Sequence, residues 1–248
     1  MTTTMETTMA SNSRIKASVM KRLKTVKAAQ HQALRVAGNG NPKYWKSQPT
    51  VGEQEIFAKF KAEVKDYYRA EQGFLCCYCS VFLHDDHSTF DAEHIIDKSN
   101  HSSIMFELSN LAAACRPCNR AKNRKQVIAA GVVAPPVPTK DTDYQIVHPH
   151  LDNWDDYLEF DEFDRIRAKN QSPKGAFTIR TCKIGGINAA RLAIYFGKGR
   201  GKAEKSLQQF FRYKQKSKKH AHLDLLRKLA RRGTKDARAI IKRLEQEV

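Results

Sequence analysis

Four cysteines in two C-x-x-C pairs are the residues of this sequence best suited to hold a metal ion. The two pairs are separated by 35 residues and consist of Cys76, Cys79, Cys115 and Cys118. Each pair can form a tight turn that presents two thiolates to one tetrahedral ion, which predicts a closed, structural Zn²⁺ site. Cys77 could replace Cys76 only through a less usual C-x-C spacing, and Cys182 is left over. Disulfide or redox use of the cysteines is the alternative.

Acid, histidine and asparagine residues between and just after these pairs add a candidate active site. Glu93 directly precedes His94 in the short apolar, strand-like run 90–96, Asn110 lies shortly before the second pair, and Asn119 follows its last cysteine. A histidine with a pKa near neutrality can take a proton from water. Carboxylate and amide oxygens suit Mg²⁺ or Mn²⁺ better than zinc. The pattern therefore favours a second, catalytic ion.

This arrangement resembles the HNH, or ββα-metal, endonuclease family, in which a β-hairpin and a helix clamp one divalent ion. The resemblance implies that His94 is the general base, that Asn110 braces the loop and that Asn119 is the metal ligand on the helix. The acid before the base is more usually Asp in that family. Because Glu93 stands there in this chain, we consider both Glu93 and Asp91 as ligands of the catalytic Mg²⁺ or Mn²⁺.

Basic residues surround the last cysteine pair, where Pro117 indicates the first turn of a helix. Lys122 follows Asn119 by about one helical turn and lies on the same face, so we expect it to contact the phosphate. Further contacts to the DNA backbone are expected from Arg116, Arg120, Arg124 and Lys125. Contacts of this kind position DNA without reading its bases, which predicts weak sequence specificity.

The charge of the chain favours nucleic acid as a partner. The formal net charge is +18, and residues 198–248 contain 17 Lys and Arg against 5 Asp and Glu, which places +12 of that excess in the final fifth. Such an excess attracts polyanions and favours phosphate contacts. The alternative is a soluble basic protein with a solvated charged face.

Composition and hydropathy favour a soluble, cytoplasmic protein. Hydrophobic residues make up 41% and charged residues 28% of the chain. No apolar run approaches the roughly 20 residues that a membrane span requires. The Thr-rich start lacks the apolar core of a secretory signal. Thiols stay reduced in the cytoplasm, which again favours metal over disulfide.

Hydrophobic periodicity predicts an α+β, mainly helical fold. The resemblance implies that it contains a ββα-metal HNH core with a four-cysteine zinc site, flanked by helices and followed by a basic helical C-terminal extension. Strands are expected over 90–96 and 174–180. Helices are expected over 13–36, 52–72, 117–130, 203–219, 223–232 and 235–247, with another from 188. Tyr44 and Trp45 are interpreted as packing residues, with base stacking as the alternative.

The chain is predicted to divide into five segments. These are a disordered tail (1–12), N-terminal helices (13–72), the nuclease core with its zinc knuckles (73–131), an accessory α+β segment (132–196) and a basic helical extension that binds DNA or a partner (197–248).

The accessory segment carries a second, weaker resemblance. The segment is similar to the one that follows the nuclease core in HNH proteins encoded beside ATPases in anti-phage systems such as Septu and retrons. The similarity rests on four features in order: the His148-Pro149 step, an acidic stretch over 152–164, the run from Lys174 to Ile179, and Asn188 before Arg191. This similarity implies an ATPase partner and a role in antiviral defence. His148 and His150 are interpreted as structural.

Together these patterns predict a metal-dependent HNH endonuclease that hydrolyses DNA with low sequence specificity as an effector of anti-phage defence. One alternative is a non-catalytic, zinc-stabilised protein that binds nucleic acid. Another is a subunit of a larger complex whose nuclease stays silent until a partner signals.

Overall fold

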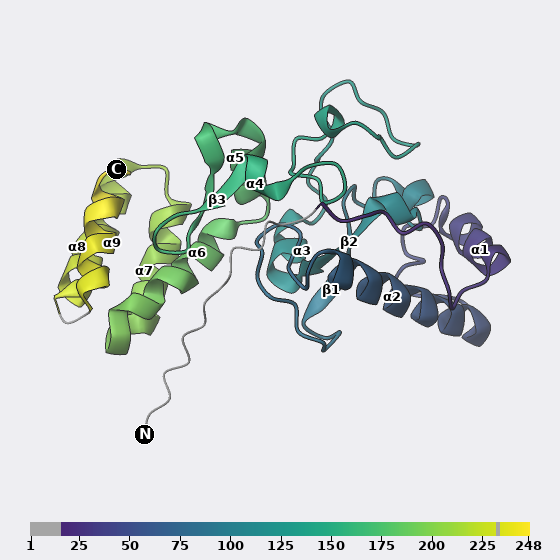
Figure 1. The fold of residues 1–248 in the computed structure, drawn as a ribbon, viewed down its shortest axis with the longest axis horizontal. Coiled ribbons are helices and arrows are strands. Elements are labelled where there is room, and N and C mark those ends of the chain that lie inside the picture. The colour runs from purple at the N-terminus through teal and green to yellow at the C-terminus, as the bar shows by residue number, and fades with distance from the viewer. Residues whose placement is uncertain (1–15, 232–233) are drawn as a thin grey trace.

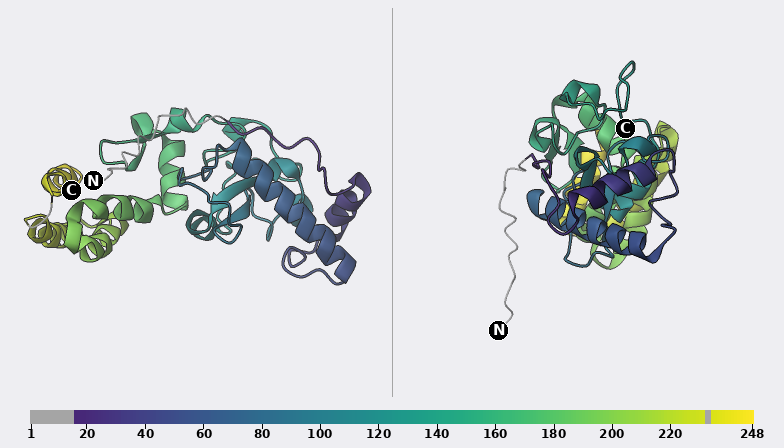
Figure 2. Two further views of the ribbon diagram at one scale, coloured as in Figure 1. Left: turned by 60° about the horizontal axis from the view of Figure 1, so that its bottom comes forward. Right: turned by 90° about the vertical axis from the view of Figure 1, so that its right-hand side faces the viewer.

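The computed structural model describes residues 16–231 and 234–248, so the tail predicted at 1–12 lies outside the described residues. The described chain is α+β and mainly helical, with two small antiparallel sheets of two strands each, which confirms the predicted class. The molecule is elongated, with the helices of the C-terminal end at one extremity and α1 and α2 at the other (Figures 1 and 2). No described helix combines the length and the hydrophobicity needed to cross a membrane.

Helix α2 (Val51–Glu71) is the longest element beside the predicted nuclease core. It starts at a capping box, in which the Thr50 side chain accepts from the Glu53 N–H while the Glu53 side chain accepts from the Thr50 N–H. Its buried face includes Phe60, Val64 and Tyr68. The prediction of a helix over 52–72 is therefore correct to within one residue at each end.

The helix predicted over 13–36 is wrong over residues 16–27, and its first three residues lie outside the described chain. Helix α1 covers only Ala28–Gly38, and residues 16–27 run without regular structure along α2 and the accessory segment. Non-local hydrogen bonds hold this stretch: the Ala17 N–H donates to Pro149 O at 3.0 Å, and the Glu63 carboxylate accepts from the N–H groups of Lys24 and Thr25. These tertiary contacts override the helical periodicity of the stretch.

Strands β1 (Phe90–His94) and β2 (Leu111–Cys115) pair antiparallel, with Phe90 opposite Cys115 and His94 opposite Leu111. The short 3-10 helices η1 (Ser102–Ile104) and η2 (Leu108–Asn110) lie in the connection. Helix α3 (Arg116–Lys122) follows β2 directly, with Pro117 in its first turn. It ends eight residues before the predicted end at 130, because Asn123 has φ 46° and leaves the helical conformation.

The accessory segment contains η3 (Asp141–Asp143), α4 (Trp154–Tyr157), the antiparallel pair β3 (Leu158–Phe160) and β4 (Ile166–Ala168), η4 (Lys169–Gln171) and α5 (Pro173–Thr181). The strand predicted over 174–180 is thus wrong. The Ser172 side chain accepts from the Gly175 N–H and Pro173 stands at the first helical position, and both are signals of a helix start.

Helices α6 (Ile184–Ala193), α7 (Arg200–Arg212), α8 (Lys216–Ala230) and α9 (Lys235–Glu245) complete the chain, with η5 (Ile194–Gly199) between α6 and α7. The break between α7 and α8 falls at residues 213–215, before the predicted end at 219. Buried hydrophobic residues form two clusters, one from Met20 to Ile184 and one from Ala189 to Leu244. The segment boundaries drawn from the sequence stay a prediction.

Candidate active site

The four cysteines of the two C-x-x-C pairs converge on one point. Their sulfur atoms all lie within 4.8 Å of one another, and all four residues are buried. The sulfurs of Cys79 and Cys115 are 3.6 Å apart. A tetrahedral zinc ion with bonds of about 2.3 Å separates its sulfur ligands by roughly 3.8 Å. The cluster therefore fits Zn²⁺, with Cys76 and Cys79 from the turn after α2, Cys115 from the end of β2 and Cys118 from α3.

A separate cavity of about 270 Å³ lies between β1, α2, α3 and the loops around residues 45 and 98. It brings together most of the residues singled out in the sequence, and it also contains basic residues from other elements. Its lining includes Trp45, Lys61, Asp91, Glu93, His94, Asp97, Lys98, Asn119, Arg120, Lys122 and Arg124. A cavity rich in Lys and Arg beside a few acids suits a phosphate group that approaches a bound cation.

His94 ends β1 and is only 5% exposed. Its Nε2 lies 3.1 Å from Met105 O. Because a carbonyl oxygen only accepts, Nε2 carries the hydrogen and Nδ1 keeps its lone pair in the neutral ring. Burial, with help from the charges of Lys98 and Lys122, holds the pKa of His94 well below its usual value. The imidazole is therefore neutral near pH 7 and can accept a proton.

Glu93 is paired inside the protein. Lys122 Nζ lies 2.9 Å from Glu93 Oε1, and the side chains are 2% and 1% exposed. The Tyr78 hydroxyl donates to the same oxygen at 3.2 Å. Burial raises the pKa of Glu93, and the Lys122 charge opposes this shift. Lys122 thus lies in a buried ion pair at the cavity, and its expected phosphate contact stays a prediction.

Asp91 and Asn119 lie together on the wall of the cavity. Asn119 Nδ2 donates to Asp91 Oδ2 at 2.7 Å, and Arg116 Nε is 3.9 Å from Asp91 Oδ1. One carboxylate oxygen and the amide oxygen of Asn119 are left for a ligand. Among the described residues, only the four cysteines form a group of three or more Cys, His, Asp and Glu ligands. The Asp91 and Asn119 oxygens still fit Mg²⁺, which keeps several waters and binds proteins through one or two carboxylates.

Asn110 is completely buried behind the site. Its Oδ1 accepts from the Ile96 N–H at 2.8 Å, and its Nδ2 donates to Ile96 O at 3.0 Å and to Ile104 O at 3.3 Å. These bonds hold the connection after β1 against the start of β2. The role of Asn110 as the brace of this loop stays a prediction.

The remaining basic candidates divide into two groups. Arg120 and Arg124 line the cavity, and Arg116 lies beside Asp91. Lys125 instead donates to Thr181 O at 2.7 Å, at the end of α5. The structure therefore does not bring Lys125 into the cavity with the other candidates.

Sequence reasoning missed several residues that line this cavity or support it. Trp45 packs edge-on against the His94 ring at 4.2 Å and lines the cavity, in addition to its place in the core. Lys61 and Lys98 also line the cavity. Tyr78, inside the first cysteine pair, contacts Glu93. Trp45 and Lys61 carry no sequence signal, because only tertiary folding brings them near residue 94.

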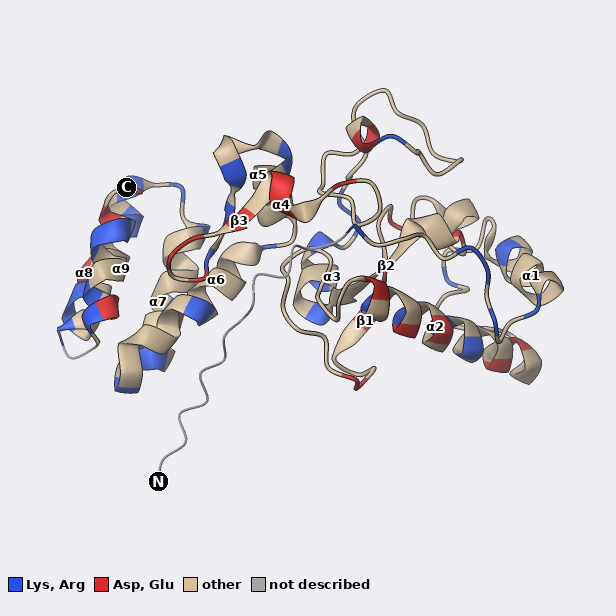
Figure 3. Ribbon diagram, in the orientation of Figure 1, with Lys and Arg blue, Asp and Glu red and all other residues tan. Residues whose placement is uncertain are grey.

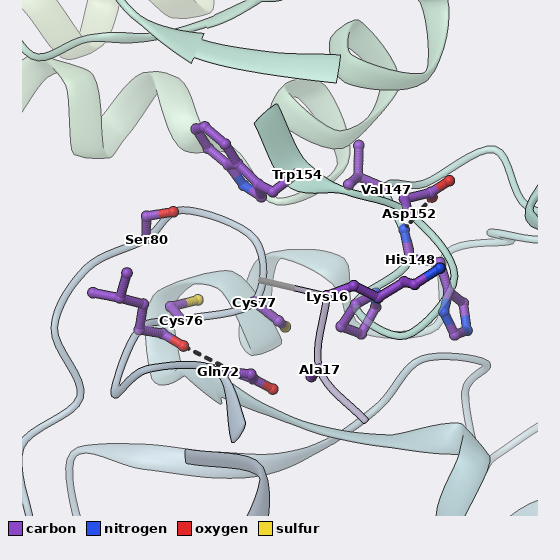
Figure 4. Close-up of a pocket in the computed structure, with 12 residues that line it drawn as sticks. Lys16, Ala17, Gln72, Cys76, Cys77, Ser80, Val147, His148, Asp152 and Trp154 are labelled. Atoms are coloured by element: carbon purple, nitrogen blue, oxygen red, sulfur yellow. Dashed lines mark hydrogen bonds between the residues drawn. The ribbon is translucent and has the colours of Figure 1, made fainter. Parts of the chain in front are cut away.

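His148 lines a small cavity of about 40 Å³ next to Cys76 and Cys77 (Figure 4), and neither His148 nor His150 lines the cavity that contains His94. The His150 ring faces two carbonyl oxygens, with Nε2 2.7 Å from Leu111 O and Nδ1 3.1 Å from Ala17 O. The ring of His148 accepts from the His150 N–H at 3.2 Å. These contacts join the accessory segment to β2 and to the N-terminal stretch, as expected of structural residues.

Comparison with known families adds the decisive observation. Residues 76–125 match the family model described as HNH endonuclease. These residues form an HNH endonuclease domain. The matched stretch contains the cysteine cluster, both strands of the β1–β2 pair and α3. A comparison of the whole chain with curated proteins found no match, so the HNH domain is the part of the chain to which a family can be assigned.

Proposed function

We propose that this chain is a metal-dependent endonuclease that hydrolyses DNA phosphodiester bonds, with His94 as the general base. The observation that supports this most directly is the cavity of the HNH domain, in which His94, Asp91 and Asn119 share a wall with exposed arginines. A non-catalytic zinc module would need the cysteines and the basic surface but would have no use for this cavity.

In this proposal the neutral His94 ring takes a proton from the attacking water through Nδ1. The Met105 carbonyl holds the hydrogen on Nε2 and so fixes the tautomer, and Trp45 packs against the ring edge. General base catalysis of this kind contributes about 10²- to 10⁴-fold to a rate. Arg120, Arg124 and Lys98 bind the negative charge of the phosphate and its neighbours.

Asp91 and Asn119 hold the catalytic Mg²⁺ or Mn²⁺ in this proposal, and Asn110 keeps the loop after β1 in place. The bound ion would supply Lewis-acid stabilisation of the phosphate and of the leaving oxygen. Glu93 remains a second candidate ligand, but its carboxylate is already neutralised by Lys122. The cysteine cluster holds Zn²⁺ as a structural ion, since a closed four-thiolate site leaves no position for water.

We further propose low sequence specificity, because the basic side chains near the cavity are suited to phosphates. The accessory segment supports a role as an effector of anti-phage defence together with an ATPase, through the resemblance described for His148-Pro149, Asn188 and Arg191. A reducing compartment such as the cytoplasm would keep the four thiols available for zinc.

A plasmid-nicking assay tests the proposal. We expect the zinc-loaded protein to nick or cut supercoiled plasmid with Mg²⁺ or Mn²⁺ and not with EDTA. His94→Ala should abolish cleavage while zinc content, thermal stability and DNA affinity stay close to the wild type. His84→Ala, which removes an exposed histidine outside the cavity, is the matched control and should cut normally. Unchanged nicking by His94→Ala would refute the assignment of the base, and DNA binding without any cleavage would favour the non-catalytic zinc protein.

A further inference from the structure

The C-terminal helices form a unit with a hydrophobic core of its own. Its buried residues run from Ala189 in α6 to Leu244 in α9 and do not belong to the cluster beneath the HNH domain. The buried Arg165, which lies just before β4, attaches the unit to the β3–β4 pair. Its guanidinium forms ion pairs with Asp161 at 2.6 Å and with Glu247 at 2.9 Å. Residues 198–231 and 234–248 thus have a defined fold that displays their positive charge.

Two helices of this unit carry exposed cations at helical spacing. On and just before α7 these are Lys198, Lys202, Lys205 and Arg212, and on α9 they are Lys235, Arg238 and Lys242. We call these two sets the cationic stripes. Neighbouring members are mostly three or four residues apart, and like charges at that spacing destabilise a helix by a few tenths of a kcal/mol per pair. The stripes therefore weaken the isolated helices.

The acids of the unit do not neutralise the stripes. Asp224 and Glu245 both pair with Arg227, and Glu247 pairs with Arg165. The other two acids lie on the stripe helices: Glu204 of α7 accepts from Gln208 at 3.4 Å, and Asp236 lies in the first turn of α9. No ion pair within the described part of the chain includes a stripe residue. Figure 3 shows Lys and Arg spread along α7, α8 and α9, with few acids among them. The described part of the unit thus displays an excess of positive charge that an external anion would compensate.

We infer that the cationic stripes bind the phosphate backbone of a nucleic acid, as a second contact surface separate from the cavity of the HNH domain. An anionic membrane is the less suitable partner, because an interfacial helix must insert an apolar face. The apolar faces of both helices are buried, with Leu207 and Phe210 of α7 and Ile240 and Leu244 of α9 all in the core. That the nucleic acid is DNA rests on the proposed function.

Binding of a short DNA duplex to the full-length, zinc-loaded protein tests this inference. The His94→Ala background prevents cleavage, so that affinity is measured without turnover. Three variants carry the same loss of three charges. Two remove stripe residues: Lys198→Gln/Lys202→Gln/Lys205→Gln and Lys235→Gln/Arg238→Gln/Lys242→Gln. The control, Lys21→Gln/Arg22→Gln/Lys24→Gln, removes exposed cations from the N-terminal stretch. Glutamine keeps good helix propensity at the helical positions of the two stripe variants.

We expect each stripe variant to weaken binding by about ten-fold or more and to lower the slope of log Kd against log salt by about two to three, since each lost phosphate contact removes about 0.9 from that slope. The control should change the slope by less than about one. An equal loss of affinity in the control would show that only net charge matters, which overturns the inference. Unchanged binding in both stripe variants would exclude this surface and overturn it as well. Stripe-dependent binding to phosphatidylserine vesicles but not to DNA would also overturn it.

The same variants separate this inference from the proposed function. In the wild-type His94 background, the stripe variants should raise KM for plasmid and leave kcat unchanged. If the wild-type protein cuts nothing but binds DNA through the stripes, the proposed function fails and the inference stands. If it cuts normally with either stripe removed and with KM unchanged, the inference fails and the proposed function stands.

Discussion

The ammonium group of Lys122 lies 2.9 Å from the carboxylate of Glu93, and both side chains are almost completely buried. This pair joins the last turn of α3 to β1 at the cavity of the HNH domain. It neutralises the acid that directly precedes the proposed base. The partner of Glu93 in this structure is therefore an amine, and the carboxylate closest to Asn119 is Asp91.

Removal of the Lys122 charge should destabilise the domain strongly, because a buried ion is then left without its partner. We expect Lys122→Met to lower the free energy of unfolding by about 3 kcal/mol or more. The double variant Glu93→Gln/Lys122→Met should recover most of that loss, since no uncompensated charge remains. Urea unfolding of the wild type, both single variants and the double variant measures the coupling. A double variant that is as unstable as Lys122→Met would show that packing, not charge, accounts for the effect.

Metal dependence should separate Asp91 from Glu93. We expect Asp91→Asn to raise the Mg²⁺ or Mn²⁺ concentration for half-maximal cleavage by at least about ten-fold, because loss of even an outer partner of a metal ligand reduces affinity by that factor. Glu93→Gln should change this concentration much less, although it lowers stability. Metal titrations of plasmid cleavage by both variants provide the measurement. The reverse order of effects would assign the ion to Glu93 and require Lys122 to move away when the metal binds.

The zinc site should require Cys76 and not Cys77. Of these two adjacent cysteines, Cys76 and not Cys77 belongs to the group of four whose sulfurs lie within 4.8 Å of one another. Cys76→Ser should therefore release zinc and unfold the HNH domain, because structural zinc contributes folding free energy directly. Cys77→Ser is the matched control and should retain about one zinc ion per chain and a normal melting temperature. Zinc analysis and circular dichroism would detect the opposite result, in which Cys77 holds the ion.

Stability should fall as the pH is lowered through the range in which free histidine titrates. Burial, together with His150 and Lys174, holds the pKa of His148 well below its usual value of about 6.5. The unfolded chain then binds a proton that the folded chain does not, so stability is full above about pH 6.5 and declines below it by up to about 1.4 kcal/mol per pH unit for this residue. His148→Asn can keep an acceptor near the Nδ1 position without titrating, and its unfolding free energy should decline less steeply between pH 6.5 and 5.5. Equal slopes for the two proteins would contradict this prediction.

Local sequence signals were sufficient to predict the starts of two helices and the meeting of the four cysteines. The capping box at Thr50 and Glu53 defines the start of α2, and Pro117 indicates the start of α3. The spacing of the cysteines was enough to predict that their sulfurs meet, because each C-x-x-C turn needs few residues to form. Ser172 and Pro173 were equally good signals for α5, but the alternating pattern of the residues after them was interpreted as a strand.

Contacts between distant segments account for the remaining errors. Residues 16–27 have helical periodicity, but Glu63, Tyr68 and Pro149 accept hydrogen bonds from their backbone and hold them extended. The Glu93–Lys122 pair spans 29 positions of sequence, and nothing in either neighbourhood indicates it. For the same reason Trp45 was interpreted as a packing residue, with base stacking as the alternative, and not as a neighbour of His94, because the loop that carries it reaches His94 only in the folded chain.

Arg191 of α6 donates to Cys79 O at 3.3 Å and to Asp164 O at 3.0 Å. It therefore connects the turn that carries two of the sulfur ligands to the helix from which the C-terminal unit begins. The zinc-binding turn thus helps to hold α6, and with it the C-terminal unit, in position. Chelation of the ion should therefore unfold this turn together with the HNH domain, and because Arg191 then loses the Cys79 carbonyl, it should also loosen the attachment of the C-terminal unit.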